Sequence, residues 1–184
     1  MKSLILTLSL TLFLFSFTIP NRVYTTIASV NGSSVTLNEA LPIKGMSALV
    51  VRSTNSGEYA LVYIKSNGDN RATIIDSDPV GGKNLAKLKP TPKVGDRVIG
   101  GFNYDKVLVL APKNRYNQIV SQLGVKVIDP ELYMAYRANG GSSSYKDFAK
   151  IAGVGLVIVA NGNTIEIIDA ISEETILKES IKWS

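Results

Sequence analysis

Residues 89–116 read Lys89-Pro-Thr-Pro-Lys-Val-Gly-Asp-Arg-Val-Ile-Gly-Gly-Phe-Asn-Tyr-Asp-Lys-Val-Leu-Val-Leu-Ala-Pro-Lys-Asn-Arg-Tyr116. The two early prolines favour extended backbone and prevent a helix, and Gly95-Asp96 is a turn signal. Two strand-like segments follow, Arg97–Ile99 and Lys106–Leu110, and a helical pattern begins after Pro112. We therefore interpret the stretch as the closure of a β-rich half and the start of a second half, with a ligand-binding loop as the alternative.

The residues before this stretch carry strand signals separated by turns. Asn31-Gly32 is a hairpin signal, and similar turn sequences recur at roughly the spacing of an antiparallel sheet or a small barrel. The predicted strands are Val23–Val30, Ser34–Leu37, Ser47–Arg52, Tyr59–Lys65 and Arg71–Asp76. The sequence predicts a β-rich domain over residues 22–110, with Lys106–Leu110 as its last strand.

The residues after Pro112 alternate between helical and strand patterns. Asn114 and Asp129 are predicted N-caps of two helices, and the second has proline at its first position. A third helix follows Ser144, which with Asp147 forms a predicted capping box. The remaining segments are a hairpin over Leu156–Asp169 and a final strand over Glu174–Lys178. Residues 113–184 are thus predicted to be an α/β domain, and the whole chain an α+β protein.

The first residues have the features of an export signal. Lys2 precedes sixteen uncharged, mostly apolar residues, Leu4–Ile19. This length is just below the roughly 17–25 residues needed to span a bilayer, which favours a secretion signal over residues 1–19. Pro20 lies where cleavage would be expected and no A-x-A pattern is evident, so an uncleaved N-terminal anchor stays open. Either alternative predicts an exported protein of the periplasm or the cell surface, in contact with the membrane only through this segment if it is uncleaved.

The composition narrows the chemistry available to the chain. The sequence contains neither cysteine nor histidine, which removes the usual zinc and copper ligands and the thiol and imidazole nucleophiles. We expect no cofactor and no metal site.

Two catalytic alternatives use other residue types. Ser143 and Lys146 have the S-x-x-K spacing of some hydrolases, a pattern that is common by chance. Paired carboxylates occur at Asp76 and Asp78, and again at Asp129 and Glu131, but each is also explained by turn formation or helix capping. We expect a protein that is not an enzyme and keep an envelope hydrolase as an alternative.

The excess positive charge is concentrated in and just before residues 89–116. The chain carries a net charge of +5. Residues 81–113 hold seven basic residues against two acidic ones, and the basic residues are Lys83, Lys87, Lys89, Lys93, Arg97, Lys106 and Lys113. Such a cluster is either a solvated loop or a patch for an envelope protein or an anionic surface component. Nucleic acid is not an expected partner, because no aromatic residues are interleaved with the lysines.

Several short segments together resemble a known family, the N-terminal domain of the plasminogen-binding protein PgbA of epsilon-class Gram-negative bacteria. The matching segments, in the family's order, are Gly45-Met-Ser-Ala-Leu-Val-Val51, Pro92-Lys-Val-Gly-Asp-Arg-Val98, Tyr104–Pro112 with Tyr116, Asp129-Pro-Glu-Leu132, Lys146-Asp-Phe148 and Val154-Gly-Leu-Val157. The resemblance covers roughly residues 25–180.

The resemblance implies an exported envelope protein and, in the named members, binding of host plasminogen through lysines. This sequence ends in Lys182-Trp-Ser184 without a Lys-rich tail. We therefore expect a binding or assembly module of the envelope. A plasminogen binder that uses internal lysines such as Lys83, Lys87, Lys89 and Lys93 is the alternative.

Overall fold

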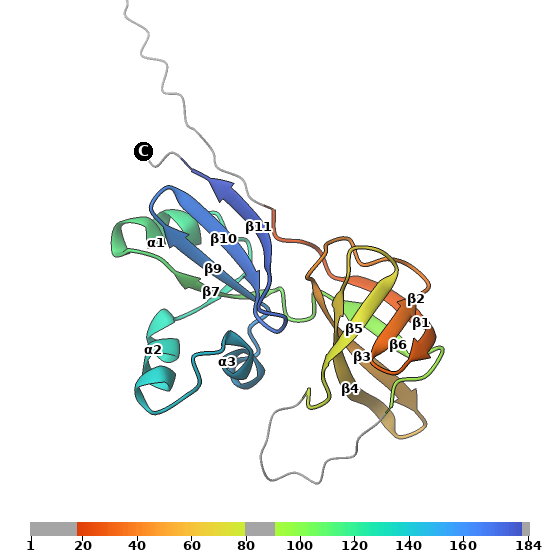
Figure 1. Cartoon of the computed structure of the whole chain (residues 1–184). Coiled ribbons are helices and arrows are strands. Elements are labelled where there is room, and N and C mark those ends of the chain that lie inside the picture. The colour runs from red at the N-terminus through yellow and green to blue at the C-terminus, as the bar shows by residue number, and fades with distance from the viewer. Residues whose placement is uncertain (1–17, 80–90, 182–184) are drawn as a thin grey trace, which may run out of the picture.

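The computed structural model describes residues 18–79 and 91–181. It contains a closed six-stranded barrel followed by a five-stranded sheet with three short helices (Figure 1). The predicted α+β class, with an antiparallel β half before an α/β half, is confirmed.

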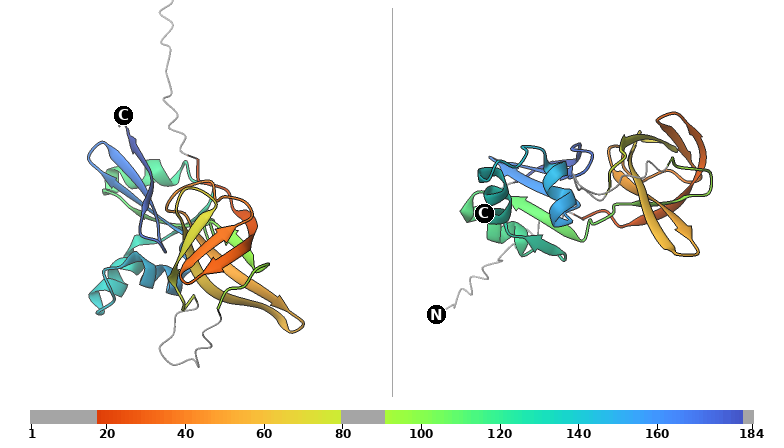
Figure 2. Two further views of the ribbon diagram at one scale, coloured as in Figure 1. Left: turned by 45° about the vertical axis from the view of Figure 1, so that its right-hand side comes forward. Right: turned by 90° about the horizontal axis from the view of Figure 1, so that it is seen from below.

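The barrel has the strand order β1-β2-β5-β4-β3-β6, and every pairing in it is antiparallel. Figure 2 shows it from two further directions. Its strands are β1 (Val23–Asn31), β2 (Ser34–Leu37), β3 (Ser47–Thr54), β4 (Gly57–Ser66), β5 (Arg71–Asp76) and β6 (Arg97–Gly100). Each strand that the sequence predicted before residue 100 is present.

Strand β6 closes the barrel because it pairs with both β1 and β3. Its last residue, Gly100, lies so close to the interior that an added Cβ would approach Val23 Cγ2 to 2.6 Å and Leu41 Cδ2 to 2.7 Å. Only glycine fits there without moving its neighbours. The prediction that residues 89–116 close the β-rich half is therefore confirmed.

The turn before β6 is fixed by a partly buried ion pair. The carboxylate of Asp96 accepts hydrogen bonds from Arg52 Nε at 2.8 Å and Nη2 at 2.7 Å, and from the Lys93 backbone N–H at 2.7 Å. Burial alone would raise the pKa of Asp96, but the Arg52 and Lys93 hydrogen bonds outweigh it and hold this pKa below its ordinary value. This two-pronged contact ties the turn to β3.

The second sheet has the strand order β11-β10-β9-β7-β8. Its strands are β7 (Lys106–Leu110), β8 (Lys126–Ile128), β9 (Leu156–Asn161), β10 (Thr164–Asp169) and β11 (Thr175–Ser180). Strand β7 pairs in parallel with β8 and β9, whereas β9, β10 and β11 form an antiparallel meander.

The assignment of Lys106–Leu110 to the β-rich half was wrong, because β7 is an inner strand of the second sheet. Gly101 and Asn103 have positive φ angles of 65° in the linker and turn the chain out of the barrel. Val107, Leu108 and Val109 are all fully buried, the pattern of a strand covered on both faces.

The helices cover opposite faces of this sheet. Helix α1 (Lys113–Val120) buries Ile119 in the core cluster that contains Val107 and Val109. Helices α2 (Pro130–Ala138) and α3 (Tyr145–Ala152) pack in the cluster that contains Leu108. Because Leu108 alternates with its neighbours along β7, α1 lies on one face and α2 and α3 lie on the other.

The N-cap residues of the three helices agree only in part with those predicted from the sequence. Asp129 caps α2 as predicted, since its carboxylate accepts the Glu131 backbone N–H at 2.9 Å. The N-cap of α1 is Pro112 rather than Asn114. Ser144 is the N-cap of α3, but its hydroxyl makes no capping bond.

The predicted capping box of α3 was therefore wrong. The Tyr145 backbone N–H donates instead to Glu173 Oε1 at 2.7 Å, so a carboxylate distant in sequence takes the place of the local cap. A charged acceptor makes a stronger hydrogen bond than a hydroxyl does.

The barrel and the second sheet are joined by the carboxylate of Asp169, which is fully buried. One oxygen, Oδ2, accepts the Ser47 backbone N–H of β3 at 2.7 Å and the Tyr104 hydroxyl at 2.6 Å. The other, Oδ1, accepts the backbone N–H groups of Ile171 at 2.9 Å and Ser172 at 2.8 Å. One side chain thus binds the barrel, the linker and the turn after β10.

We predict that Asp169→Ala lowers the free energy of unfolding by at least about 3 kcal/mol, because it leaves several buried donors without an acceptor. Asp129→Ala is the matched control: it removes an exposed helix cap and should cost about 1 kcal/mol. Urea denaturation of both variants measures the difference. Equal losses in the two variants would show that Asp169 does not join the two sheets.

Candidate functional site

Four of the seven predicted basic residues lie in the part of the chain that the structure describes, and these four are not on one surface. Lys83, Lys87 and Lys89 lie outside the described residues. Lys93 is exposed on the turn before β6, and Arg97 forms an ion pair with Glu58 at 2.9 Å on the barrel.

The other two predicted basic residues lie at opposite ends of β7. Lys106 begins the strand, and Lys113 follows its end. The five residues of β7 span roughly 13 Å. The described part of the predicted patch is therefore distributed between the barrel and both ends of the second sheet.

Lys113 lies at a hollow beside the carboxyl ends of β7 and β8. The hollow has a volume of about 630 Å³ and is lined by Ala111, Lys113, Tyr116, Asn117, Val127, Asp129, Pro130 and Glu131. The chain leaves β7 toward α1 on one face of the sheet and leaves β8 toward α2 on the other. Such a switch point opens a crevice outside the strand ends, which is the usual position of ligand sites in sheets with parallel strands.

The two helix ends at this hollow differ in charge. Helix α2 begins in the expected way, with Asp129 as its cap and Glu131 in its first turn. Helix α1 has neither a side-chain cap nor an acidic residue in its first turn, and it begins with Lys113. The hollow therefore has a basic wall from α1 and an acidic wall from α2.

The start of α1 breaks a local rule of helix stability. The amino end of a helix carries a partial positive charge, so a lysine at its first position is unfavourable. Lys113 is also exposed. Violations of local preference occur most often at functional sites. Lys113 and the exposed Asn117 one turn later are therefore the residues that best mark a binding surface.

Apolar surface lies on the helix that supplies the acidic wall. Leu132 and Met134 of α2 are 59% and 62% exposed. Neither residue is among those that line the hollow. Large exposed apolar side chains of this kind are frequent on surfaces that contact another protein.

A second cluster of charges lies between the barrel and α3. The carboxylate of Asp76, at the end of β5, contacts Lys150 Nζ and lies 3.9 Å from Lys146 Nζ. The side chains of Asp76 and Lys150 are only 11% and 10% exposed. This is a largely buried ion pair that ties α3 to the barrel.

The residues of the S-x-x-K pattern take separate structural contacts. Lys146 faces Asp76, as above, and the backbone carbonyl of Ser143 accepts the Tyr133 hydroxyl at 3.3 Å. The carboxylate pairs also have local partners: Asp76 accepts the Asp78 backbone N–H, and Asp129 accepts that of Glu131.

Within residues 18–79 and 91–181, no group of three carboxylates lies close enough together to hold a metal ion. Among the helices of these same residues, none has the length and apolar character needed to cross a membrane.

The hollow was not predicted from the sequence. Asp129 was predicted only as a helix cap and was not connected to Lys113. The missing step was the placement of Lys106–Leu110. Once that strand is assigned to the second sheet, the carboxyl ends of β7 and β8 become neighbours.

Comparison with known protein families identifies a match. A family model described as "Plasminogen-binding protein pgbA N-terminal" matches residues 22–184. No curated protein and no solved structure matches the chain.

The tyrosine beside the Asp76 cluster predicts a pH dependence of stability. Burial, and then the negative charges of Asp76 and Asp169, raise the pKa of Tyr63 to about 12. A pKa raised on folding gives stability that is complete below the unfolded value of about 10 and is lost as pH rises toward 12. We expect the free energy of unfolding to fall by about 2–3 kcal/mol over this window through Tyr63 alone.

Urea denaturation between pH 8 and pH 12 measures this loss. The variant Tyr63→Phe should show a smaller decline over the same window, because it removes the ionisable hydroxyl. An identical decline in the two proteins would contradict the assignment to Tyr63.

Proposed function

The chain belongs to the plasminogen-binding protein PgbA N-terminal family, and we propose that it is a non-enzymatic binding module of the cell envelope. It is exported and acts in the periplasm or at the cell surface. Its binding surface is the hollow at the carboxyl ends of β7 and β8. The observation that carries this proposal is the exposed Lys113 at the start of α1, which has no side-chain cap, at the hollow beside the carboxyl ends of two parallel strands.

The partner is a protein segment that presents an acidic group to the start of α1. Lys113 and the amino end of the helix both favour negative charge. The exposed Leu132 and Met134 add apolar contact area on the neighbouring helix. The acidic wall formed by Asp129 and Glu131 sets the orientation, because it repels the same acidic group.

A charge reversal at Lys113 tests this surface without damaging the fold. Lys113→Glu places an acidic residue at the first position of α1, where the helix dipole favours it, so stability should be unchanged or slightly higher. A photo-crosslinking residue at Asn117 should give a discrete protein adduct in intact envelopes. We expect Lys113→Glu to reduce this adduct at least about tenfold, which corresponds to the loss of one charge-assisted contact.

The control is Lys178→Glu, a charge reversal on the exposed edge strand β11. Because Lys178 forms an ion pair with Glu166, the free energy of unfolding of this variant is measured alongside. Lys178→Glu should leave the Asn117 adduct unchanged. An adduct of equal strength in both variants would contradict the hollow as the binding surface. An adduct to lipid rather than protein would favour an anionic surface component as the partner.

The family description supports a second candidate, binding of plasminogen through internal lysines. Among the described members of the predicted patch, Lys93 and Lys113 are exposed and could present their ammonium groups to a partner. Arg97 is engaged with Glu58, so it is a weaker candidate.

Surface plasmon resonance with immobilised protein tests the second candidate. We expect Lys93→Ala combined with Lys113→Ala to weaken plasminogen binding at least about tenfold, and a free lysine analogue to compete in the same way. Lys178→Ala is the control and should bind as the unaltered chain does. Binding that survives the analogue, or no binding at all, would exclude this function.

A further inference from the structure

A second cavity, of about 420 Å³, lies at the amino ends of β7 and β8, whereas the hollow lies at their carboxyl ends. This volume is in the range of small-molecule sites. Three of its lining residues directly precede strands: Arg22 precedes β1, Asp105 precedes β7 and Val125 precedes β8. The cavity is therefore built from strand starts of both the barrel and the second sheet.

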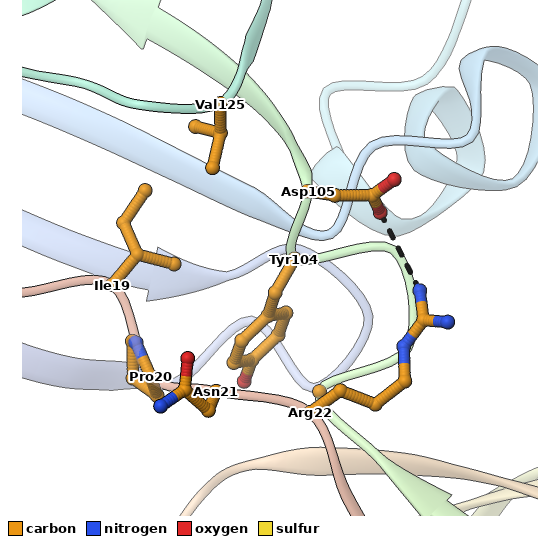
Figure 3. A pocket seen from close by; sticks show the side chains of 8 residues that line it. Ile19, Pro20, Asn21, Arg22, Tyr104, Asp105 and Val125 are labelled. Carbon is orange, nitrogen blue, oxygen red and sulfur yellow. Dashed lines mark ion pairs between the residues drawn. The ribbon is translucent and has the colours of Figure 1, made fainter.

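This cavity has an apolar end and a charged end. In the view of Figure 3, Ile19 and Val125 lie to the left of Tyr104. The ion pair of Arg22 and Asp105 lies to its right. Tyr104 is only 3% exposed and its hydroxyl is hydrogen-bonded, so its ring is a fixed wall between the two ends. A ligand that fits this cavity has an apolar part and a charged part.

The charged end has hydrogen-bonding capacity that the protein does not use. Arg22 Nη2 lies 3.6 Å from Asp105 Oδ1, beyond the roughly 2.7–2.9 Å of a charge-assisted hydrogen bond. Among the described residues, the guanidinium has one further contact, 5.8 Å from the ring centre of Phe102, and the Asp105 carboxylate has no further hydrogen bond or ion pair. The two charged side chains are 40% and 64% exposed, so a ligand can reach both.

These two groups select a ligand that carries both charges. A carboxylate pairs with the two parallel N–H donors of a guanidinium, and an ammonium group donates to a carboxylate. A ligand with a carboxylate alone is repelled by Asp105, and one with an ammonium group alone is repelled by Arg22. In an α-amino acid both groups are attached to one carbon atom, so they are close enough together to meet Arg22 and Asp105 at the same time.

We propose that this cavity binds a free α-amino acid with an apolar side chain. The ligand carboxylate lies on Arg22, its ammonium group lies on Asp105, and its side chain lies against Tyr104, Ile19 and Val125. Burial of the side chain supplies most of the affinity, because exposed ion pairs contribute little. The two charges supply the selectivity for a zwitterion. This site is separate from the hollow at the carboxyl ends of β7 and β8, so the inference does not rest on the proposed function.

Isothermal titration calorimetry of the purified full-length chain with L-leucine and L-phenylalanine tests the ligand class. We expect binding, and we expect three analogues of leucine to bind at least about tenfold more weakly. These are 3-methylbutylamine, which lacks the carboxylate, 4-methylpentanoate, which lacks the ammonium group, and glycine, which lacks the apolar side chain. No binding of either amino acid, or equal binding of the amine or the acid, would overturn the inference.

Two substitutions test the charged end of the cavity. Arg22→Gln and Asp105→Asn each remove one charge, and each should weaken L-leucine binding about tenfold. The matched control is Arg71→Gln, because Arg71 is an exposed arginine that pairs with Asp69 at 2.6 Å elsewhere on the barrel. The control should bind L-leucine as the unaltered chain does, and all three variants should keep its unfolding temperature. Equal affinity of Arg22→Gln and Arg71→Gln for L-leucine would contradict the assignment.

Nuclear magnetic resonance locates the ligand on the protein. Addition of L-leucine should shift the backbone amide resonances of Asn21, Arg22 and Val125 and leave those of Lys113 and Asn117 unchanged. Shifts confined to Lys113 and Asn117 would place the amino acid in the hollow. That result would overturn this inference and leave the hollow standing as a binding surface.

Discussion

The buried carboxylate of Asp169 is the contact on which the arrangement of the two sheets depends. A charge removed from water is tolerated only when hydrogen bonds replace its hydration. Four donors do so here, and they come from the barrel, the linker and the turn after β10. Separation of the barrel from the second sheet would leave these donors without their acceptor. Ser172 strengthens the same junction, since its hydroxyl donates to the Gly45 carbonyl at 2.6 Å.

The packing of the barrel against the second sheet also fixes the position of the proposed binding surface. The hollow at β7 and β8 is built from strand ends and helix starts whose positions are fixed by the two core clusters, and both clusters include barrel residues. A partner that contacts Lys113 therefore meets a preorganised surface and loses little free energy to ordering it. The barrel, with its interior filled by side chains, acts as a support for this surface. That division is compatible with the binding module that we propose.

Much of the fold could be predicted from local signals. The turn at Asn31-Gly32, the Asp129-Pro130 helix start and the hairpin around residue 162 are each specified by a few adjacent residues, and all are present. The predictions that were wrong concern contacts between residues far apart in the sequence. The sheet to which Lys106–Leu110 belongs depends on pairing with β8 and β9, and the start of α3 is capped by Glu173, far along the chain. The hollow was missed for the same reason, since it exists only where two strand ends from different segments come together.

Native-state hydrogen exchange tests most directly whether Asp169 and the shared cores make the barrel and the sheet one cooperative body. The amides to compare are those of buried residues in β3, such as Val50, and in β9, such as Ile158. We predict that both sets of amides exchange only through global unfolding, with the same free energy of opening and the same dependence on urea. Two distinct free energies, with one sheet opening while the other stays protected, would contradict it.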